Sequence, residues 1–334
     1  IPIDFHPKFK NKRALEIVLS TLHAGGKFDS NSYKTSGGLH GVGISVVNAL
    51  SSSLQVTVFK NSKKYSQKYS KGNVKSKIKI EKCKKNEKGT EIIFIPDETI
   101  FETIKFSPKK LYDFIKMKAV LVSGTSIDFK IDKELIVDST PSYEKFYFKN
   151  GIADYLDIKN KNSAKLFDKQ FSIVNKINDT EKCEIFISFN QSEKSSLVSF
   201  CNTIETPDGG SHENGFKNGI IKAIKLYGQK NQVAKISNIN INDLTDYSDI
   251  FISIFINEPS FEGQTKKRII MPKLQKQLET IIQNEFILWL NTNKKITKNL
   301  IDILIERSLL RTDLTKIKEL ERKSFKERHK LPGK

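Results

Sequence analysis

A cluster of glycines near the amino-terminal end holds residue types that could bind a phosphate group. Gly37, Gly38, Gly41 and Gly43 lie within one short segment. Glycine lets the backbone adopt positive φ angles and pass close to a ligand. A helix that began here would point unpaired N–H groups and the positive end of its dipole at an anion. Because tight turns also use clustered glycines, the spacing alone leaves phosphate binding and a turn as alternatives.

A lysine in the second half of the chain could add a positive charge to phosphate binding. Lys266 ends the triplet Gln264-Thr265-Lys266, which follows an apolar segment at 250–256 that is typical of a buried strand. A lysine on a loop after a rigid strand is a point charge that can meet a terminal phosphate. It can equally be an ordinary surface lysine beside Lys267 and Arg268. The residues alone leave both interpretations open.

The elements that would position these residues follow from the hydrophobic pattern. Apolar residues at helical spacing predict a helix over 13–23, and a second helix is predicted from Gly41 through Leu50. Between them lies a loop rich in Gly, Asn and Ser at 24–38. The remaining elements of this half are predicted as strands at 54–59, 74–80, 90–95, 126–131 and 135–138, with a helix at 108–121. This order favours an α+β layer over a doubly wound sheet.

A domain boundary is expected around 139–147, after Thr140-Pro141, and the second half continues the mixture of strands and helices. Its predicted elements are strands at 171–174, 183–189 and 197–202, a turn at 206–210 leading into a helix, a strand at 250–256, and long helices at 272–290 and 297–328.

The composition is that of a folded, strongly basic chain. Hydrophobic residues make up 37% and charged residues 28% of 334 residues, and the formal net charge is +19. The length allows two domains. Such a charge favours a polyanionic partner such as nucleic acid, but the Lys-rich composition of an AT-rich genome explains it equally well. The basic stretch at 322–330 is likewise either a solvated helix face or a DNA contact.

Several protein classes are disfavoured by the same composition. Cys83, Cys183 and Cys201 show neither CxxC nor Cys/His ligand spacing, which argues against a zinc site or a disulfide framework. No apolar run approaches the ~18 residues of a membrane helix, and no signal peptide is recognisable. The sequence therefore predicts a cytoplasmic protein with no membrane contact. Since the chain opens on Ile1 rather than Met, its true amino terminus is expected to lie upstream.

Two segments resemble the ATP lid of the gyrase B family, whose members are GHKL ATPases. They are 22–28 (Leu-His-Ala-Gly-Gly-Lys-Phe) and 36–43 (Ser-Gly-Gly-Leu-His-Gly-Val-Gly), with Tyr33 between them where that lid carries a tyrosine. Ile1-Pro2-Ile3-Asp4 resembles the end of the family's Asp-Asn-Gly-Arg-Gly-Ile-Pro-Val-Asp box. Gly89-Thr90 resembles the strand whose threonine touches the adenine end of the nucleotide.

The resemblance implies a set of site residues. Gln264-Thr265-Lys266 resembles the transducer loop whose lysine reaches the γ-phosphate, which makes Lys266, with Gln264, the expected catalytic contact. Gly209-Gly210-Ser211-His212 resembles a transducer signature, with Ser211 where the family usually has Thr, and His212 is expected to pack at a helix start. The expected ATP-binding residues are Ile1, Pro2, Lys27, Tyr33, Gly38, Leu39, His40, Gly41, Val42, Gly43 and Thr90.

The resemblance also implies an α+β fold over the whole chain. Residues 1–140 would form a GHKL-type α/β sandwich (incomplete), and 141–330 a transducer domain of ribosomal protein S5 domain 2-like α/β fold. Residues 331–334 would start the following metal-binding (TOPRIM) domain. The implied activity is that of the B-type component of a bacterial type IIA DNA topoisomerase, using ATP and Mg²⁺ to drive double-strand passage. Implied partners are double-stranded DNA, the A-type DNA-cleaving subunit and a second copy of the ATPase region, in a cytoplasmic, nucleoid-associated setting.

Some parts of the family's machinery are expected outside this chain. The glutamate that activates water, the asparagine that holds Mg²⁺ and the aspartate that reads adenine would all precede Ile1, so no metal ligand is predicted here. The acidic Mg²⁺ cluster for DNA cleavage would follow Lys334. The chain by itself is therefore expected not to hydrolyse ATP.

Two rival functions stay in view. One is another GHKL ATPase, of the mismatch-repair or chaperone type, against which the segment 22–28 together with Gln264-Thr265-Lys266 speaks. The other is a non-enzymatic, basic nucleic-acid-binding relic. Within the gyrase B family, 286–291 (Phe-Ile-Leu-Trp-Leu-Asn) and 96–99 (Pro-Asp-Glu-Thr) look closer to the topoisomerase IV branch than to gyrase.

Overall fold

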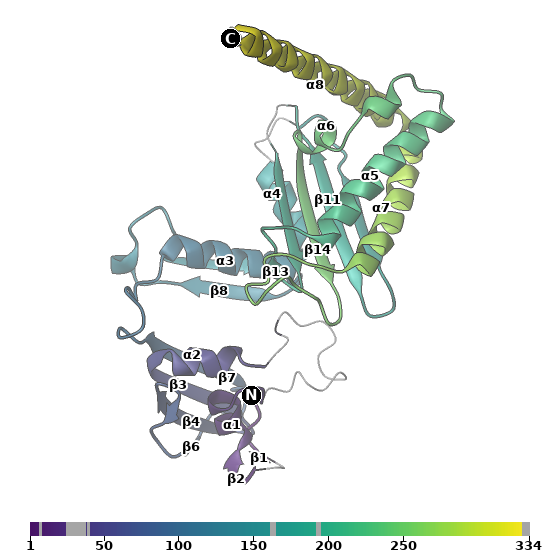
Figure 1. Ribbon diagram of the computed structural model, residues 1–334. Coiled ribbons are helices and arrows are strands. Elements are labelled where there is room, and N and C mark those ends of the chain that lie inside the picture. Colours follow the sequence, from purple (N-terminus) through teal and green to yellow (C-terminus); the bar gives the residue numbers. More distant parts are fainter. Residues whose placement is uncertain (7–8, 25–37, 39–40, 161–164, 192–194, 329–334) are drawn as a thin grey trace. The chain divides into compact units, whose positions relative to one another are not determined.

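The computed structural model describes residues 1–6, 9–24, 38, 41–160, 165–191 and 195–328. The chain divides into two compact units. The first contains 1–114 with 130–142, and the second contains 115–129 with 143–334. Both mix helices and sheet (Figure 1), so the predicted α+β class is confirmed.

The first unit is built on an antiparallel sheet of order β5-β4-β3-β7. Its strands are β3 (Ser51–Lys60), β4 (Lys63–Ser70), β5 (Asn73–Val74) and β7 (Gly89–Pro96), and β6 (Lys79–Lys82) also pairs with β4. The β3–β4 turn is Asn61-Ser62, with φ values of 55° and 57°, as a two-residue hairpin turn requires. The strand predicted at 74–80 is wrong, because 75–78 joins β5 and β6 outside any strand.

Two short helices cover one face of this sheet. They are α1 (Ala14–Ser20) and α2 (Gly43–Ala49), both shorter than predicted. A hairpin of β1 (Phe5–His6) and β2 (Phe9–Arg13), which the sequence did not predict, precedes α1. The buried core between helices and sheet consists of Ile3, Leu15, Leu19, Leu54, Val56, Val58, Tyr65 and Tyr69.

In the segment between the two sheets, the predicted helix is confirmed and one predicted strand is wrong. Helix α3 (Pro108–Leu121) and strand β8 (Ser126–Lys130) occur as predicted. The strand predicted at 135–138 is wrong, since Leu135 ends a 3-10 turn (Lys133–Leu135) and 136–138 belongs to no strand. Strand β8 pairs with β9 (Tyr143–Tyr147), which lies where the sequence placed only a boundary.

The second unit contains a sheet of order β10-β11-β14-β12-β13. Strand β14 pairs antiparallel with β11 and parallel with β12. The bounds are β10 (Phe171–Lys176), β11 (Lys182–Phe189), β12 (Ser196–Cys201), β13 (Ile204–Glu205) and β14 (Ser248–Phe255). Strand β14 is buried over nearly its whole length. One face packs Ile250, Ile252 and Ile254 into the main core, and Phe251 on the other contacts Tyr155 of α4 (Ile152–Asn160).

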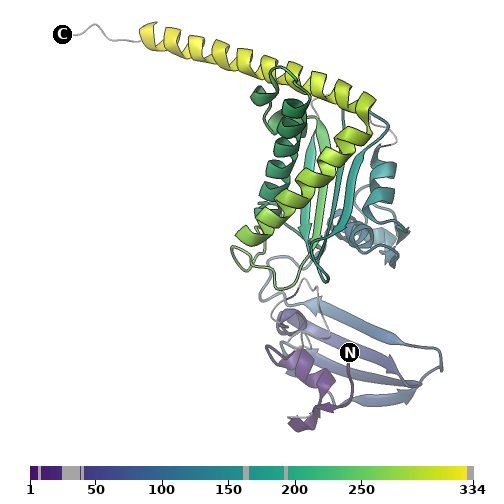
Figure 2. The ribbon, with the colours of Figure 1, turned by 90° about the vertical axis from the view of Figure 1, so that its right-hand side faces the viewer.

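Helices α5 (Ser211–Lys230) and α7 (Pro272–Thr292) lie side by side on the sheet (Figures 1 and 2). Two glycines allow their close approach. A Cβ on Gly215 would lie 2.7 Å from the Gln275 carbonyl oxygen, and one on Gly219 would lie 2.8 Å from that of Glu279. Short connecting elements, 3-10 Ile236–Asn238 and α6 (Asn242–Thr245), lead back to β14.

Helix α8 (Lys294–Arg328) closes the described chain and extends beyond the sheet (Figure 2). The two long carboxy-terminal helices were predicted, and both are confirmed. Within the described ranges, no helix combines the length and apolar character needed to cross a bilayer.

Candidate functional site

Two residues predicted to bind the nucleotide, Ile1 and Thr90, lie together in the first unit. The backbone nitrogen of Ile1 lies 3.2 Å from Thr90 Oγ1, and both residues are exposed. Pro2 is also exposed, whereas Ile3 is buried in the core. The first residues are therefore anchored by Ile3 and present their backbone beside the start of β7.

Strand β7 offers an apolar surface that the sequence analysis missed. In β7, Thr90, Ile92 and Phe94 pair with Val58, Val56 and Leu54 of β3. Their side chains therefore point to the face of the sheet that α1 and α2 cover. Yet Ile92 is 39% and Phe94 42% exposed. Ile92 lies two residues from Thr90 on the same face, where alternation along a strand would have identified it. This row can receive a flat apolar group.

The glycine cluster is described in part. Gly41 has a φ of 60°, in the left-handed region that glycine adopts without strain, and it leads to Val42, the N-cap of α2. Helix α2 starts at Gly43, where a Cβ would meet no atom within 4 Å. Gly38 is half-buried. Lys27, Tyr33, Leu39 and His40 lie outside the described residues.

Asn48 holds these segments together, and no local sequence pattern marks it. Its side chain is fully buried on α2, and its Nδ2 donates to the carbonyl oxygens of Leu19 at 2.9 Å and Gly72 at 3.4 Å. The end of α1 and the β4–β5 turn are thereby tied to the helix that follows the glycine cluster. The desolvation of a buried amide is offset only when the amide is hydrogen-bonded, which makes Asn48 a structural support of the site.

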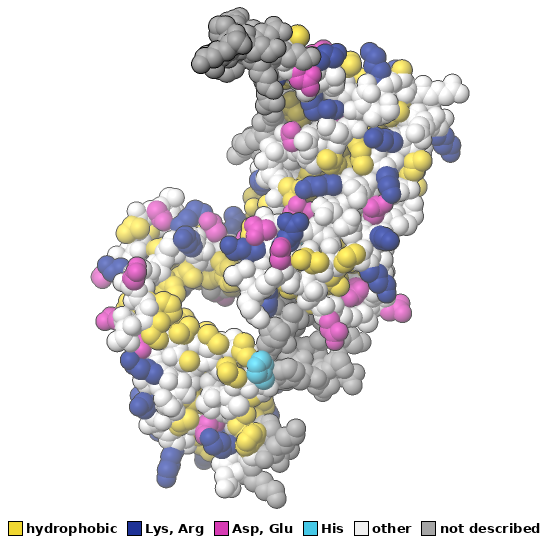
Figure 3. Space-filling view, viewed as in Figure 1, with side chains coloured by type: hydrophobic (Ala, Val, Ile, Leu, Met, Phe, Trp, Pro, Cys, Tyr) yellow, Lys and Arg dark blue, Asp and Glu magenta, His cyan; other side chains and the backbone are white. Residues whose placement is uncertain are grey.

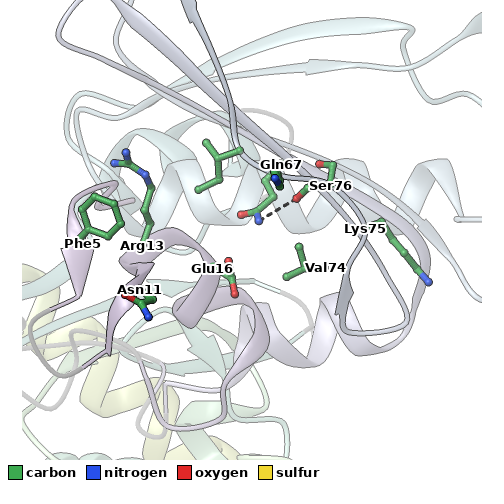
Figure 4. Close-up of a pocket in the computed structure, with 10 residues that line it drawn as sticks. Phe5, Asn11, Arg13, Glu16, Gln67, Val74, Lys75 and Ser76 are labelled. Atoms are coloured by element: carbon green, nitrogen blue, oxygen red, sulfur yellow. Dashed lines mark hydrogen bonds between the residues drawn. The ribbon is translucent and has the colours of Figure 1, made fainter.

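A separate groove of about 470 Å³ lies in the first unit and contains none of the predicted site residues (Figure 4). Its walls come from the β1–β2 hairpin, α1 and the segment after β5. Arg13 is held there by a 2.9 Å bond to the Ile3 carbonyl oxygen and stacks 4.5 Å from the Phe5 ring centroid. Gln67 Nε2 donates to the Ser76 carbonyl oxygen at 3.2 Å. This groove is therefore distinct from the predicted nucleotide site.

In the second unit, Lys266 lies at the tip of a hairpin between β14 and α7. Phe261 and Ile269 form its antiparallel bridge, and the Lys266 N–H donates to the Gly263 carbonyl oxygen at 3.1 Å. Lys266 has a left-handed φ of 57° and is half-buried, while Gln264 is exposed. Burial and Glu181 raise the pKa of Cys201 to about 12, and the charge of Lys266 opposes that rise.

The hairpin runs directly beside the Gly209-Gly210 turn, so the two predicted transducer segments meet. Gly210 forms a parallel bridge with Ile269. A Cβ on Gly210 would lie 2.2 Å from the Ile269 carbonyl oxygen, and its φ of 127° and ψ of −151° belong to a region used almost only by glycine. Glycine is required here by both contact and conformation.

His212 packs at the start of α5, as expected, and is fully buried. The Thr206 hydroxyl donates to the Ser199 carbonyl oxygen at 3.0 Å and is hydrogen-bonded to His212 Nε2 at 2.9 Å. His212 Nδ1 is buried without a hydrogen-bond partner in the described part of the chain. Burial and then the charge of Lys217 lower the pKa of His212 to about 4. The imidazole is therefore neutral at pH 7 and holds the Thr206 turn.

This lowered pKa predicts acid sensitivity of the second unit. The unfolded chain, with an ordinary histidine pKa near ~6.5, binds the proton that the fold excludes, so stability is present above that value and is lost as pH falls toward 4. Between pH 7 and 5, the free energy of unfolding should fall by about 2 kcal/mol on account of His212. Urea unfolding followed by Trp289, the chain's single tryptophan, measures this. His212→Gln should show a correspondingly flatter pH dependence; an unchanged slope would contradict the assignment.

The described residues contain no group of three or more His, Cys, Asp or Glu side chains that could hold a metal ion. The apolar row on β7, the glycine cluster and Lys266 are instead residue types that suit a nucleotide's base and phosphates.

Solved structures share this architecture. The topoisomerase IV ATP-binding domain of Francisella tularensis matches with a TM-score of 0.72 and 29% identity, covering 93% of this chain and 81% of that one. The 43K ATPase domain of Thermus thermophilus gyrase B matches with a TM-score of 0.71 and 25% identity, over 96% of this chain and 81% of that one. The fold is that of the ATPase regions of type II topoisomerases.

The sequence comparisons identify the family. A family model described as DNA gyrase B matches residues 151–320. The B-type subunit of DNA topoisomerase 4 from Rickettsia felis is 41% identical over 337 residues, covering 100% of this chain and 51% of that protein. The chain belongs to the DNA gyrase B family, and the resemblance noted in the sequence is confirmed. It spans about half the length of the curated relatives it matches.

Proposed function

We propose that this chain is the ATP-binding part of a type II DNA topoisomerase, which couples ATP binding and hydrolysis to double-strand DNA passage. The observation that supports this most directly is the hairpin that presents Lys266, built against the Gly209-Gly210 turn in a chain of the gyrase B family. Nucleotide binding is supported further by the structural neighbours, whose titles name ATP-binding and ATPase domains.

Each part of the chain has a distinct role in this proposal. The adenine ring would pack on Ile92 beside Thr90 and the backbone of Ile1 and Pro2. The backbone of Gly38, Leu39, His40, Gly41, Val42 and Gly43, with Lys27 and Tyr33, would bind the phosphates and ribose. Lys266, with Gln264, would contact the γ-phosphate. Bound Mg²⁺ would neutralise phosphate charge, with ligands supplied from outside this chain.

The domain assignment follows the same proposal. Residues 1–140 would be the carboxy-terminal part of the GHKL ATPase domain, 141–330 the S5-like transducer domain, and 331–334 the start of the metal-binding domain. A charge carried by the transducer can report nucleotide state only if it meets the phosphate in one arrangement of the protein and not in another.

The proposed partners are double-stranded DNA, the A-type DNA-cleaving subunit and a second copy of the ATPase region, in the bacterial cytoplasm at the nucleoid. The net charge of +19 supports a polyanionic partner. On the face shown in Figure 3, Lys and Arg side chains are spread over the second unit rather than gathered in one patch. This distribution suits contacts to phosphates and not reading of base sequence.

The chain is accordingly expected to bind duplex DNA weakly and without sequence preference. The logarithm of the affinity should fall linearly with the logarithm of salt concentration, with a slope that reports the number of phosphates neutralised. Fluorescence anisotropy on two unrelated duplexes across a salt series measures both properties. A flat salt response, or preference for one short sequence, would contradict DNA binding by charge.

Within the family we propose the topoisomerase IV branch. The named relative of Rickettsia felis supports it, as do the segments 286–291 and 96–99. Decatenation against supercoiling by the complete enzyme tests the choice. A basic binding relic predicts DNA binding without any nucleotide dependence in the extended protein. Another GHKL ATPase predicts turnover without DNA passage.

A further inference from the structure

We infer that Gly209–Ser211 is the clamp that holds the Lys266 hairpin in place, and that Ser211 is a positioning residue for Lys266. The inference rests on the proposed role of Lys266. The inference assigns a function to the turn at 209–211, which was described above only as resembling a transducer signature.

In the described part of the chain, the backbone ladder of the hairpin is short. Its two arms are joined by the N–H groups of Glu262 and Ile270, which donate to the carbonyl oxygens of Arg268 at 3.0 Å and Ser260 at 2.9 Å. The tip adds the bond from the Lys266 N–H to Gly263. A lysine in the left-handed region persists only where its surroundings hold it. A ladder this short does not fix the tip by itself.

The turn before α5 supplies the missing support. The N–H groups of Asp208 and Ser211 donate to the carbonyl oxygens of Lys267 at 3.1 Å and Ile269 at 3.0 Å, and the Ile269 N–H donates to Gly209 at 3.1 Å. The returning arm of the hairpin is thus paired on both sides immediately after Lys266. Ile269 is 1% exposed, so its two bonds, to Gly209 and Ser211, are shielded from water.

Ser211 extends the clamp with its side chain. Its hydroxyl oxygen accepts a hydrogen bond from the Met271 N–H at 2.7 Å. Met271 is the N-cap of α7, and Ser211 is the first residue of α5. One buried hydroxyl therefore connects the ends of two helices to the base of the hairpin. Removing it leaves the Met271 N–H without this partner.

The clamp is itself fastened to the sheet. Thr206 is bonded to Ser199 of β12 through its N–H at 2.9 Å and its hydroxyl at 3.0 Å. The Ser199 hydroxyl donates to Glu213 Oε1 at 2.8 Å, and His212 bonds Thr206 from the other side. Since β12, the turn and the start of α5 form one connected network, a shift of α5 is transmitted to Lys266.

The role of Ser211 is tested by a double-mutant cycle in a protein extended to the full length of its relatives. Ser211→Ala should lower kcat for ATP about tenfold and leave nucleotide affinity unchanged, because a misplaced Lys266 costs transition-state contact and not capture. Ser211→Thr keeps the hydroxyl and should restore most of the rate. Ser260→Ala, an exposed serine on the same hairpin, is the matched control.

The cycle separates positioning from general destabilisation. In a Lys266→Ala background, Ser211→Ala should cause no further loss, since there is no charge left to position. An additional tenfold loss in that background would overturn the inference, as would a normal rate for Ser211→Ala alone. If Lys266→Ala itself hydrolyses ATP normally, the proposed role of Lys266 fails instead.

A second measurement tests the clamp without activity. In the 334-residue chain, Ser211→Ala should speed amide hydrogen exchange at Met271 and at Lys266–Ile269 by about tenfold, with α5 beyond its first turn unaffected. Unchanged exchange at these amides would overturn the clamp even if turnover had fallen.

Discussion

Lys266→Ala is expected to lower kcat for ATP hydrolysis by at least ~10²-fold, about 2.7 kcal/mol of transition-state stabilisation. The variant is made in a protein extended to the full length of its relatives. Lys266 belongs to the second unit, far in sequence from the glycine cluster. In the proposed role, its charge would meet the γ-phosphate late, as the nucleotide is enclosed, so it is expected to favour the transition state over initial capture. Steady-state kinetics and nucleotide affinity are measured side by side.

Two lysine variants make this prediction specific. Lys27→Ala, in the predicted lid, should weaken nucleotide binding clearly. Lys267→Ala should change kcat and nucleotide affinity little. The Lys267 side chain is exposed, and its hydrogen bond in the hairpin is accepted by its backbone carbonyl oxygen, which the substitution retains. Normal hydrolysis by Lys266→Ala would show that the hairpin tip is ordinary protein surface with no role in ATP hydrolysis.

The elements most accurately predicted from the sequence were those with strong periodicity and buried faces. Strand β14 and helices α7 and α8 carry long apolar patterns, and each was placed within a few residues. Strand β4 was missed because its sequence, Lys-Lys-Tyr-Ser-Gln-Lys-Tyr-Ser, contains little aliphatic signal. Its inward row is Tyr65, Gln67 and Tyr69. The Tyr69 hydroxyl donates to Gln67 Oε1 at 2.7 Å, so a buried polar residue broke the expected alternation.

The candidate site was predicted residue by residue only where a local motif marks it. Lys266 and Gly210 lie in recognisable segments, and Thr90 follows a glycine at a strand start. Nothing local connects Gly210 with Ile269, which approach each other through their backbones, or Asn48 with Leu19, which are joined by a side-chain hydrogen bond between segments distant in the chain. Such contacts depend on the assembled fold, and a single sequence does not encode them at any fixed spacing.

Gly210→Ala is expected to lower the free energy of unfolding of the second unit by about 2–6 kcal/mol. A methyl group would have to displace the Ile269 backbone, with its oxygen at 2.2 Å and its nitrogen at 2.6 Å. Overpacking of this kind costs ~1–3 kcal/mol, and holding alanine in a glycine-only region adds ~1–3 kcal/mol. Neither cost can be relieved by rotating a side chain, because the atoms in the way belong to the backbone.

The measurement again uses Trp289, which lies on α7 in the second unit, so that urea unfolding reports this unit and not the first. Gly263→Ala is the matched control on the same hairpin, since its added methyl would meet no atom within 4 Å, and it should change stability by less than ~1 kcal/mol. Hydrogen exchange at Ile269 should rise in Gly210→Ala and stay unchanged in Gly263→Ala. Equal stability of the two variants would mean that the hairpin does not pack on Gly210 in solution. The physical basis for treating Lys266 as a held charge would then be lost.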